Sequence, residues 1–271
     1  MKINFHKSFW EAQCNTEQEL KDLLSKIKVE GYQGSELFLP FYFIDQDITL
    51  AAHQALDLSI ICGIGTQGDN ADDHMASMTS QIEEAIAFNP ILINSHTGRD
   101  IFSLKDNLKI FEHALFLEQK FGIPITHETH RFRPTFSTLG TEQLIDALPE
   151  LKLNLDISHW MVVHESDLSD QAERLAKLFK HVHHIHARVG YEEGPQVTDP
   201  ANEQWSAQLE NHIQLWGQVL DQANKRTQEA FTITPEFGPS PYAHTDLNGQ
   251  TLANIWQANL FMKTKLETTY G

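Results

Sequence analysis

The sequence predicts a single-domain (β/α)8 TIM barrel that spans residues 1–271. Short apolar runs alternate with longer amphipathic patterns about eight times along the chain. The length is typical of one such barrel, which needs roughly 250 residues, and no linker-like or repeated segment divides the chain. An open doubly wound sheet is the alternative, because one missed strand would change the count. However, no Gly-x-Gly-x-x-Gly turn follows the first strand, so a dinucleotide site has no support.

Eight apolar segments are expected to form the strands, and each is followed by a polar or glycine-bearing turn. They are Ile3–Phe5, Gly34–Leu39, Leu58–Ile64, Ile91–Asn94, Ile123–Glu128, Leu151–Ile157, Val182–Arg188 and Phe231–Phe237. Strands that alternate with helices in this way are typical of a parallel sheet with helices outside it.

The segments between the strands carry start and stop signals for helices. Thr16 and Glu19 have the spacing of a capping box, and Gly31 follows as a C-terminal stop. Ser103 is expected to cap a later helix that ends before Gly122. The predicted buried face of that helix consists of Leu108, Phe111, Leu115 and Leu117.

Charge and composition exclude several classes of partner. The formal net charge is −17, with 37 acidic against 20 basic residues, which argues against a nucleic-acid surface. Cys14 and Cys62 are the only cysteines and lack the spacing of a zinc ribbon or a disulfide scaffold. No run approaches the length of a secretory core or a membrane span. We therefore expect a cytoplasmic protein with no membrane or nucleic-acid partner.

Four predicted strands from residue 123 onwards carry residues that commonly bind metals at or next to their carboxyl ends. They are Glu128, Asp156, His186 and Glu236. The carboxyl ends of barrel strands converge, and Val, Ile or Leu would be the ordinary residues at such buried positions. Two of the carboxylates about 4 Å apart would repel by roughly 4 kcal/mol at an effective dielectric constant of 20. Either raised pKa values or a divalent cation must compensate, and the imidazole favours the cation.

Three oxygen donors and one nitrogen favour a particular group of metals. They suit a six-coordinate Mn²⁺, Mg²⁺ or Co²⁺ better than a closed tetrahedral Zn²⁺ site, although zinc is possible. A lone acid at a strand end is more often a helix N-cap or half of a salt bridge, and His184 by itself is more often a core histidine than a ligand. Four ligand types at matching positions shift the balance towards a metal site.

The residues around these four positions resemble the sugar phosphate isomerase/epimerase superfamily with the xylose isomerase-like TIM barrel. The resemblance rests on Glu128-Thr-His-Arg131, Asp156-Ile-Ser-His159, His184-Ile-His186-Ala-Arg188, Glu236-Phe-Gly and Gly31-Tyr-Gln-Gly-Ser-Glu36. It implies that Glu128, Asp156, His186 and Glu236 bind one divalent metal ion, and that His159 and Arg188 contact substrate oxygens. His96 and Arg99, which follow the fourth predicted strand, are further candidates for substrate contact.

The resemblance also implies a chemistry. The metal would bind a carbonyl and an adjacent hydroxyl of an open sugar, and Glu128 and Glu236 would act as the acid/base pair through an enediolate. A metal-dependent sugar isomerase or epimerase of carbohydrate metabolism is the main expectation. The alternatives are a dehydratase or lyase of a keto-sugar or keto-inositol, an apurinic-endonuclease-like nuclease, which the acidic charge disfavours, and a non-catalytic sugar-binding barrel.

Further expectations concern the pocket and the assembly. Segment 189–200 is long for a connection and is interpreted as a semi-rigid lid over the metal. No glycine-rich phosphate cradle is evident near the last two strands, so a free sugar or a sugar acid is preferred as substrate. The resemblance implies a homodimer or a homotetramer. Aromatic residues at or near the strand ends are candidates for apolar walls around a sugar: Phe5, Trp10, Phe38, Trp160 and Phe237.

Overall fold

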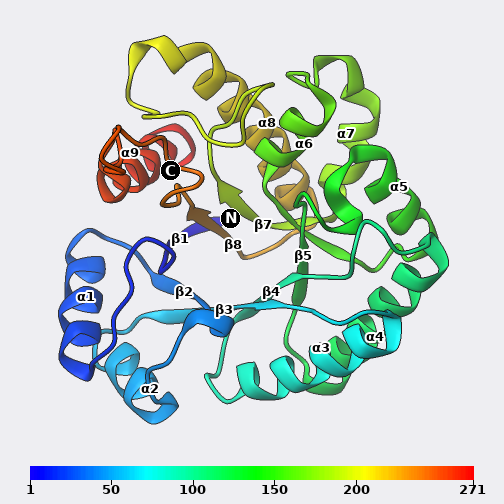
Figure 1. The fold of residues 1–271 in the computed structure, drawn as a ribbon, viewed down its shortest axis with the longest axis horizontal. Helices are drawn as coiled ribbons and strands as arrows, with labels where there is room; N and C mark the ends of the chain where they lie inside the picture. Colours follow the sequence, from blue (N-terminus) through cyan, green and yellow to red (C-terminus); the bar gives the residue numbers. More distant parts are fainter.

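A computed structural model describes residues 1–271 and shows a closed barrel of eight parallel strands. The strands follow one another around the barrel in sequence order, and β1 pairs with β8 to close it (Figure 1). The strands are β1 Lys2–Ser8, β2 Gly34–Phe38, β3 Ser59–Gly65, β4 Leu92–His96, β5 Ile125–Glu128, β6 Lys152–Leu155, β7 Val182–Ala187 and β8 Ala230–Pro235. The single-domain TIM barrel is thus confirmed, and closure excludes the open sheet.

Nine α-helices lie around the outside of the barrel (Figure 1). They are α1 Glu17–Val29, α2 Gln46–Ala55, α3 Ala71–Ile86, α4 Leu104–Phe121, α5 Thr138–Ala147, α6 Ile157–His164, α7 Ala172–Leu178, α8 Ser206–Lys225 and α9 Ile255–Tyr270. The last helix packs against β8, so the end of the chain covers the place where the barrel closes. None of the helices is both long and apolar enough to cross a membrane.

Side-chain caps fix the helix boundaries that the sequence predicts. The Thr16 side chain accepts the N–H of Glu19, and the Glu19 carboxylate accepts the N–H of Asn15. Ser103 caps α4 in the same way, and Gly122 ends that helix in the left-handed conformation.

The predicted buried face of α4 is correct at only two of its four positions. Phe111 and Leu117 are buried, whereas Leu108 and Leu115 are only partly buried. The helix is rotated so that Ile110 and Ala114 complete the stripe that faces the barrel.

The barrel interior becomes polar towards the carboxyl ends of the strands. Residues that pair across parallel strands share one side of the sheet, and the register pairs Asn94 with Thr126, Asn154 with His184, and His186 with Thr234. All six side chains are buried. The opposite side of the sheet is mostly apolar, with Ile93 paired to Ile125 and Ile185 paired to Ile233, although Ser95 and His127 also lie there. The site therefore lies in a buried, polar part of an otherwise apolar core.

Loss of stability at mildly acidic pH is expected for the metal-free protein. Burial lowers the pKa of His6, His127, His130 and His183 to about 3 and that of His212 to about 4. The unfolded chain binds these protons near pH 6.5, so stability is fully present above that pH. It is lost as the pH falls towards 4, by about 1.4 kcal/mol per pH unit for each such histidine.

His212→Gln isolates one of these contributions. The neutral ring donates from Nδ1 to the Gln208 carbonyl oxygen and accepts the Gly190 N–H at Nε2, so protonation would break the second bond. Denaturant unfolding between pH 4 and 6.5 is expected to show a slope smaller by about 1.4 kcal/mol per pH unit in this variant. The exposed His244 provides the control variant His244→Gln, which should keep the wild-type slope. An unchanged slope in His212→Gln would contradict this interpretation.

Candidate metal centre

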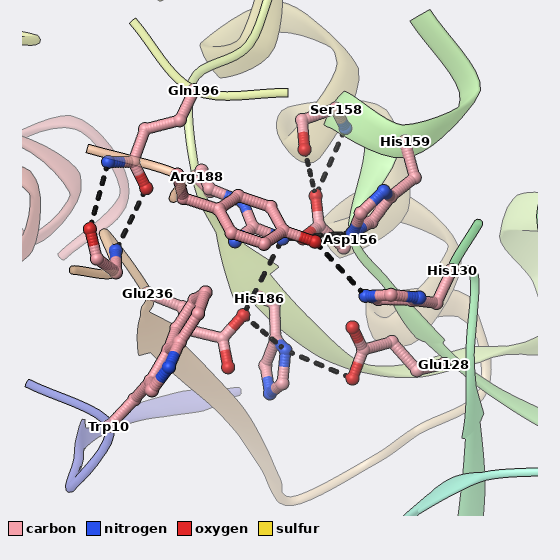
Figure 2. Close-up of polar contacts among 12 residues, drawn as sticks. Trp10, Glu128, His130, Asp156, Ser158, His159, His186, Arg188, Gln196 and Glu236 are labelled. Carbon is pink, nitrogen blue, oxygen red and sulfur yellow. Dashed lines mark hydrogen bonds and ion pairs between the residues drawn. The ribbon is translucent and has the colours of Figure 1, made fainter. Parts of the chain in front are cut away.

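Three of the four predicted metal ligands converge at the carboxyl end of the barrel. Glu128 ends β5, His186 lies on β7, and Glu236 directly follows β8. His186 Nδ1 lies 3.4 Å from Glu128 Oε2 and 3.0 Å from Glu236 Oε2. One donor atom from each residue lies within 4.8 Å of the other two, and Figure 2 shows the three side chains pointing towards one another. This group can hold a cation.

A fourth acid, Glu36 on β2, fixes the orientation of the His186 ring. His186 Nε2 lies 2.9 Å from Glu36 Oε1, so the ring donates its Nε2 proton to this carboxylate. Nδ1 is buried and forms no hydrogen bond, so it can bind a cation once its own proton is displaced. A carboxylate behind a ligating histidine is the usual arrangement at metal sites.

Removal of the Glu36 charge is expected to weaken metal binding. Glu36→Gln retains the size of the side chain but no longer favours the proton on His186 Nε2. We expect the Mn²⁺ affinity, measured by calorimetric titration, to fall about 10- to 100-fold. The exposed Glu229 gives a matched control in Glu229→Gln, which should bind as the wild type does. Equal Mn²⁺ affinities in the two variants would show that Glu36 does not contribute to metal binding.

The protonation states show how strongly the group attracts positive charge. Burial alone would lower the pKa of His186, but Glu236, Glu36 and Glu128 raise it well above its usual range. Burial alone would raise the pKa of Glu128, but His96 and His186 lower it well below its usual range. In the absence of a metal, an imidazolium therefore supplies the positive charge among the carboxylates. A divalent cation would displace that proton.

Asp156 lies beside this group but is engaged by other partners. It follows β6 directly and is the N-cap of α6, where its Oδ1 accepts the N–H and the hydroxyl of Ser158. Its Oδ2 pairs with the buried Arg188 guanidinium. Burial raises its pKa to about 6; Arg188 opposes this shift, whereas Glu128 and Glu236 add to it. The strand predicted over 151–157 ends at Leu155, because Asp156 caps α6 and the helix begins without an intervening turn.

Arg188 links Asp156 to the three converging residues. Its Nη2 lies 3.8 Å from Glu236 Oε2 while it pairs with Asp156, and Figure 2 shows it between the two acids. Burial lowers the pKa of Arg188, but the charges of Asp156 and Glu236 raise it by a larger amount, so the net shift is upward. Arg188 Nε and Nη1 are buried without a partner. Both nitrogens can therefore donate to an oxygen of a bound molecule.

His159 is held in its neutral form next to Arg188. Burial, His130 and Arg188 lower its pKa well below the usual range. Arg131 Nε donates to His159 Nδ1 at 3.1 Å, and His159 Nε2 lies 3.0 Å from Arg188 Nη2 and 3.6 Å from Asp156 Oδ2. Sequence reasoning predicts a substrate contact for His159, and in the structure its ring borders the site.

His96 is the most accessible of the predicted site residues. Its Nε2 lies 2.8 Å from Glu128 Oε2, and its side chain is 21% exposed. His130 lies between His96 and His159, with ring centroids 4.8 and 4.0 Å away. The Tyr242 hydroxyl lies 3.3 Å from His130 Nε2. This row of imidazoles lies beside the metal-site residues and presents several nitrogens to a polar ligand.

A cavity of about 540 Å³ opens above the three converging residues. Of the predicted aromatic walls, Trp10 and Phe38 line it, whereas Phe5, Trp160 and Phe237 belong to the core. The Trp10 ring packs edge to face against Tyr242 at 5.0 Å. It also rests against Gly238, where an added Cβ would come within 2.1 Å of the ring, so this position requires glycine. The volume and the mixed lining suit a small polar molecule such as a sugar.

The predicted lid, segment 189–200, is a packed part of the structure. Val189, Gln196 and Val197 are buried, and Gln196 exchanges two hydrogen bonds with the backbone of Gly238 (Figure 2). No residue of the segment lines the cavity. The lid interpretation is therefore wrong, and the segment instead supports the Gly238 backbone beneath Trp10.

Three site residues carried weak sequence signals. Glu36 is a charged residue inside a buried strand, and its only sequence signal is its place at the end of the Gly31-Tyr-Gln-Gly-Ser-Glu36 motif. Asn94 donates from Nδ2 towards Glu128 Oε2 at 3.1 Å and Glu36 Oε1 at 3.3 Å. It sits at the end of a predicted strand, two residues before His96. Tyr242 comes from the loop after β8 and has no local pattern to identify it.

Comparison with known proteins supports the fold. No family model matches the sequence, and no curated protein matches it either. Among solved structures, a D-allulose 3-epimerase from Methylomonas sp., in complex with D-allulose, is 13% identical with a TM-score of 0.69, over 99% of this chain and 98% of that chain. A probable 3-DHS dehydratase from Bacillus anthracis is 16% identical with a TM-score of 0.64, over 100% of both chains.

A third solved structure has a similar fold. A xylose isomerase-like TIM barrel protein from Mycobacterium smegmatis, in complex with magnesium, is 10% identical with a TM-score of 0.60, over 99% of this chain and 98% of that chain. At these identities the likeness is one of fold. The chain thus has a TIM barrel like those of xylose isomerase-like proteins, and this barrel holds a buried group of histidine and glutamate side chains suited to a metal.

Proposed function

We propose that the protein is a divalent-metal-dependent sugar isomerase or epimerase. The observation that carries the proposal is the buried His186 Nδ1, which forms no hydrogen bond and lies between the Glu128 and Glu236 carboxylates at the base of a cavity of sugar size. A group with this charge and burial, open to a small-molecule cavity, is a site for a cation and a ligand together.

Glu128, His186 and Glu236 would hold the metal ion, with Asp156 as a fourth ligand. Asp156 lies next to this set, because Arg188 contacts both its carboxylate and that of Glu236, and it would have to exchange Arg188 for the metal ion. Three carboxylates and one imidazole favour Mn²⁺, Mg²⁺ or Co²⁺ over zinc. When bound, the cation would supply Lewis-acid polarisation of a sugar carbonyl and its neighbouring hydroxyl, which acidifies the adjacent C–H.

Glu128 and Glu236 would then move the proton. They reach the cavity from β5 and from the end of β8, so one carboxylate can remove the proton from the carbon next to the carbonyl while the other returns one. Return to the opposite face of the same carbon gives an epimer. Return to the former carbonyl carbon, with transfer of a hydroxyl proton to the other oxygen, gives the aldose or ketose isomer.

The other residues would hold the substrate in place. Arg188 has two unpartnered guanidinium nitrogens that can stabilise negative charge on substrate oxygens. His96 lines the cavity and can bind a hydroxyl, whereas a substrate hydroxyl would reach His159 only by replacing one of its contacts with Arg131 and Arg188. Trp10, with Tyr242 at its edge, supplies an apolar wall for the carbon chain. Water is restricted because Glu128 and His186 are each only 2% exposed.

Proton exchange into D₂O tests the proposal. The chelator-treated protein would be loaded with Mg²⁺, incubated with a panel of ketoses, keto-sugars and keto-inositols, and followed by NMR for loss of the C–H signal next to the carbonyl. The expected result is metal-dependent exchange with an epimer or isomer as product. Release of water with a conjugated carbonyl product would identify a dehydratase instead. Absence of exchange across the panel, with metal shown to be bound, would contradict the proposal.

A further inference from the structure

A second cavity, of about 760 Å³, lies directly beside the metal-site cavity. It is formed around the segments that follow β2, β3 and β4. Phe38, Phe41 and Arg133 line both cavities, so they stand at the junction. Arg133 Nη2 and the His96 Cβ lie 3.9 and 4.0 Å from the point where a Cβ of Gly65 would stand. His96 in turn contacts Glu128. One molecule can therefore reach from the metal-site residues into the second cavity.

Two arginines, Arg99 and Arg133, line the second cavity and have no carboxylate partner. The chain has six arginines, namely Arg99, Arg131, Arg133, Arg174, Arg188 and Arg226. Arg174 and Arg188 form ion pairs, Arg131 donates to His159, and Arg226 donates to backbone carbonyls. Glu84 also lines the cavity but forms no ion pair with Arg99 or Arg133. In a chain with 37 acidic residues, two adjacent guanidinium groups without an acid are available for an external anion.

Both guanidinium groups are held in place by contacts that leave donors free. Arg133 Nη1 donates to the carbonyl oxygens of Thr66 and Gly98 at 3.1 and 2.8 Å, and its Nε is buried without a partner. Arg99 lies over the Phe132 ring at 3.7 Å, and its Nε is also buried and unpartnered. Burial lowers the pKa of Arg133 to about 10, so it is still charged at neutral pH. Orphaned charged donors of this kind are costly unless a ligand satisfies them.

The backbone at Phe132 is shaped to present these groups. Phe132 has a φ of +73°, in the left-handed region that a bulky residue rarely adopts. Arg131, before it, reaches His159 beside the metal-site residues, whereas Arg133, after it, lies against the loops of the second cavity. The strained residue thus sends neighbouring arginines to two different parts of the pocket.

We propose that Arg99 and Arg133 form an anion-binding subsite for a carboxylate or phosphate group of the substrate, whose carbonyl end lies at the metal-site residues. The planar guanidinium group pairs well with both kinds of anion. The inference rests on the proposed function for the position of the carbonyl end, and it narrows the substrate to an anionic sugar derivative.

Side-chain NMR of arginine tests the subsite without any turnover. Protein labelled with ¹⁵N-arginine has six Nε–H groups, which are assigned with Arg99→Lys and Arg133→Lys. The Mg²⁺-loaded protein is titrated with D-glucose, D-glucuronate and D-glucose 6-phosphate, which differ only at carbon 6. We expect the two charged probes to shift the Arg99 and Arg133 signals and to bind at least about ten-fold more tightly than D-glucose. The tighter of the two identifies the anion as carboxylate or phosphate.

The variants separate a subsite from general attraction. Arg99→Lys and Arg133→Lys should each weaken binding of the charged probes about ten-fold, because the bidentate geometry is lost. Arg174→Lys, at a surface ion pair remote from both cavities, should leave it unchanged. The inference is overturned if D-glucose shifts the two signals as far as the charged probes do, if neither charged probe shifts them, or if Arg174→Lys has the same effect. This experiment does not measure C–H exchange, so anion binding can be observed even if the isomerase proposal fails. Equally, C–H exchange can be observed even if Arg99 and Arg133 bind no anion.

Discussion

Glu236→Gln is expected to slow metal-dependent proton exchange at least about 10³-fold. The substitution retains the size of the side chain but removes a group that the proposed mechanism uses both as metal ligand and as acid or base. Glu236 Oε2 lies 3.0 Å from His186 Nδ1, so the loss also removes one of the charges that hold a cation there. The rate of C–H exchange in D₂O on a substrate found in the panel measures the effect.

Two comparisons make the result specific. Glu229→Gln changes the same residue type on the exposed segment before β8 and should exchange at the wild-type rate. Saturating Mg²⁺ should restore binding in Glu236→Gln more than it restores exchange, because a weaker ligand set can be filled by mass action whereas a missing base cannot. A Glu236→Gln variant with wild-type exchange would show that the reaction, if any, takes place elsewhere.

Arg188→Met is expected to lower the free energy of unfolding of the metal-free protein by about 3–5 kcal/mol at pH 7. Arg188 is 1% exposed and Asp156 is fully buried, so removal of the guanidinium leaves a buried carboxylate without its main counter-charge. Part of the cost will appear as protonation of Asp156, whose pKa is already raised to about 6 by burial. Denaturant unfolding of chelator-treated protein measures the change.

A surface pair and a double variant are the controls for this prediction. Arg174→Met removes the partly exposed pair with Glu142 and should cost less than about 1 kcal/mol. Combining Arg188→Met with Asp156→Asn removes both buried charges and should recover much of the lost stability. If Arg188→Met costs no more than Arg174→Met, the buried pair has no structural role.

The fold could be predicted because each barrel strand is a short apolar run bounded by turn residues. Seven of the eight strands end within two residues of the expected position; β1 runs three residues beyond Phe5 to Ser8, and the sixth strand ends two residues early, at Leu155. Asp156 explains that difference. Its Asp-Ile-Ser sequence is a usual start for a helix, but α6 is apolar and follows without a turn, so its first residues read as a continued strand.

The three converging residues could be predicted because each lies at the carboxyl end of a predicted strand, and these ends meet in a barrel. Glu128, His186 and Glu236 follow from position alone, and the structure brings them together. The ion pair of Asp156 with Arg188 joins residues 32 positions apart in sequence, and the contact of Trp10 with Tyr242 joins opposite ends of the chain. Contacts of this kind depend on how loops pack at the barrel mouth, which no period in the sequence encodes.

The positive charge beside the pocket also cannot be predicted from the sequence. Arg99 and Arg133 lie in different loops, and nothing local in the sequence shows that both lack an acidic partner. The strained Phe132 between two arginines gives no sequence signal either, since its φ of +73° is a property of the folded backbone. The overall negative charge therefore conceals a small positive region next to the candidate metal centre.

The central claim is that His186, with Glu128 and Glu236, binds one divalent cation, and calorimetric titration of Mn²⁺ into chelator-treated protein tests it most directly. Wild type is expected to bind one ion per chain and to release a proton, since the pKa of His186 is held high by the surrounding carboxylates. His186→Gln should lose at least about 100-fold in affinity, whereas the exposed control His244→Gln should bind as wild type does. The same stoichiometry and affinity in His186→Gln would contradict the account.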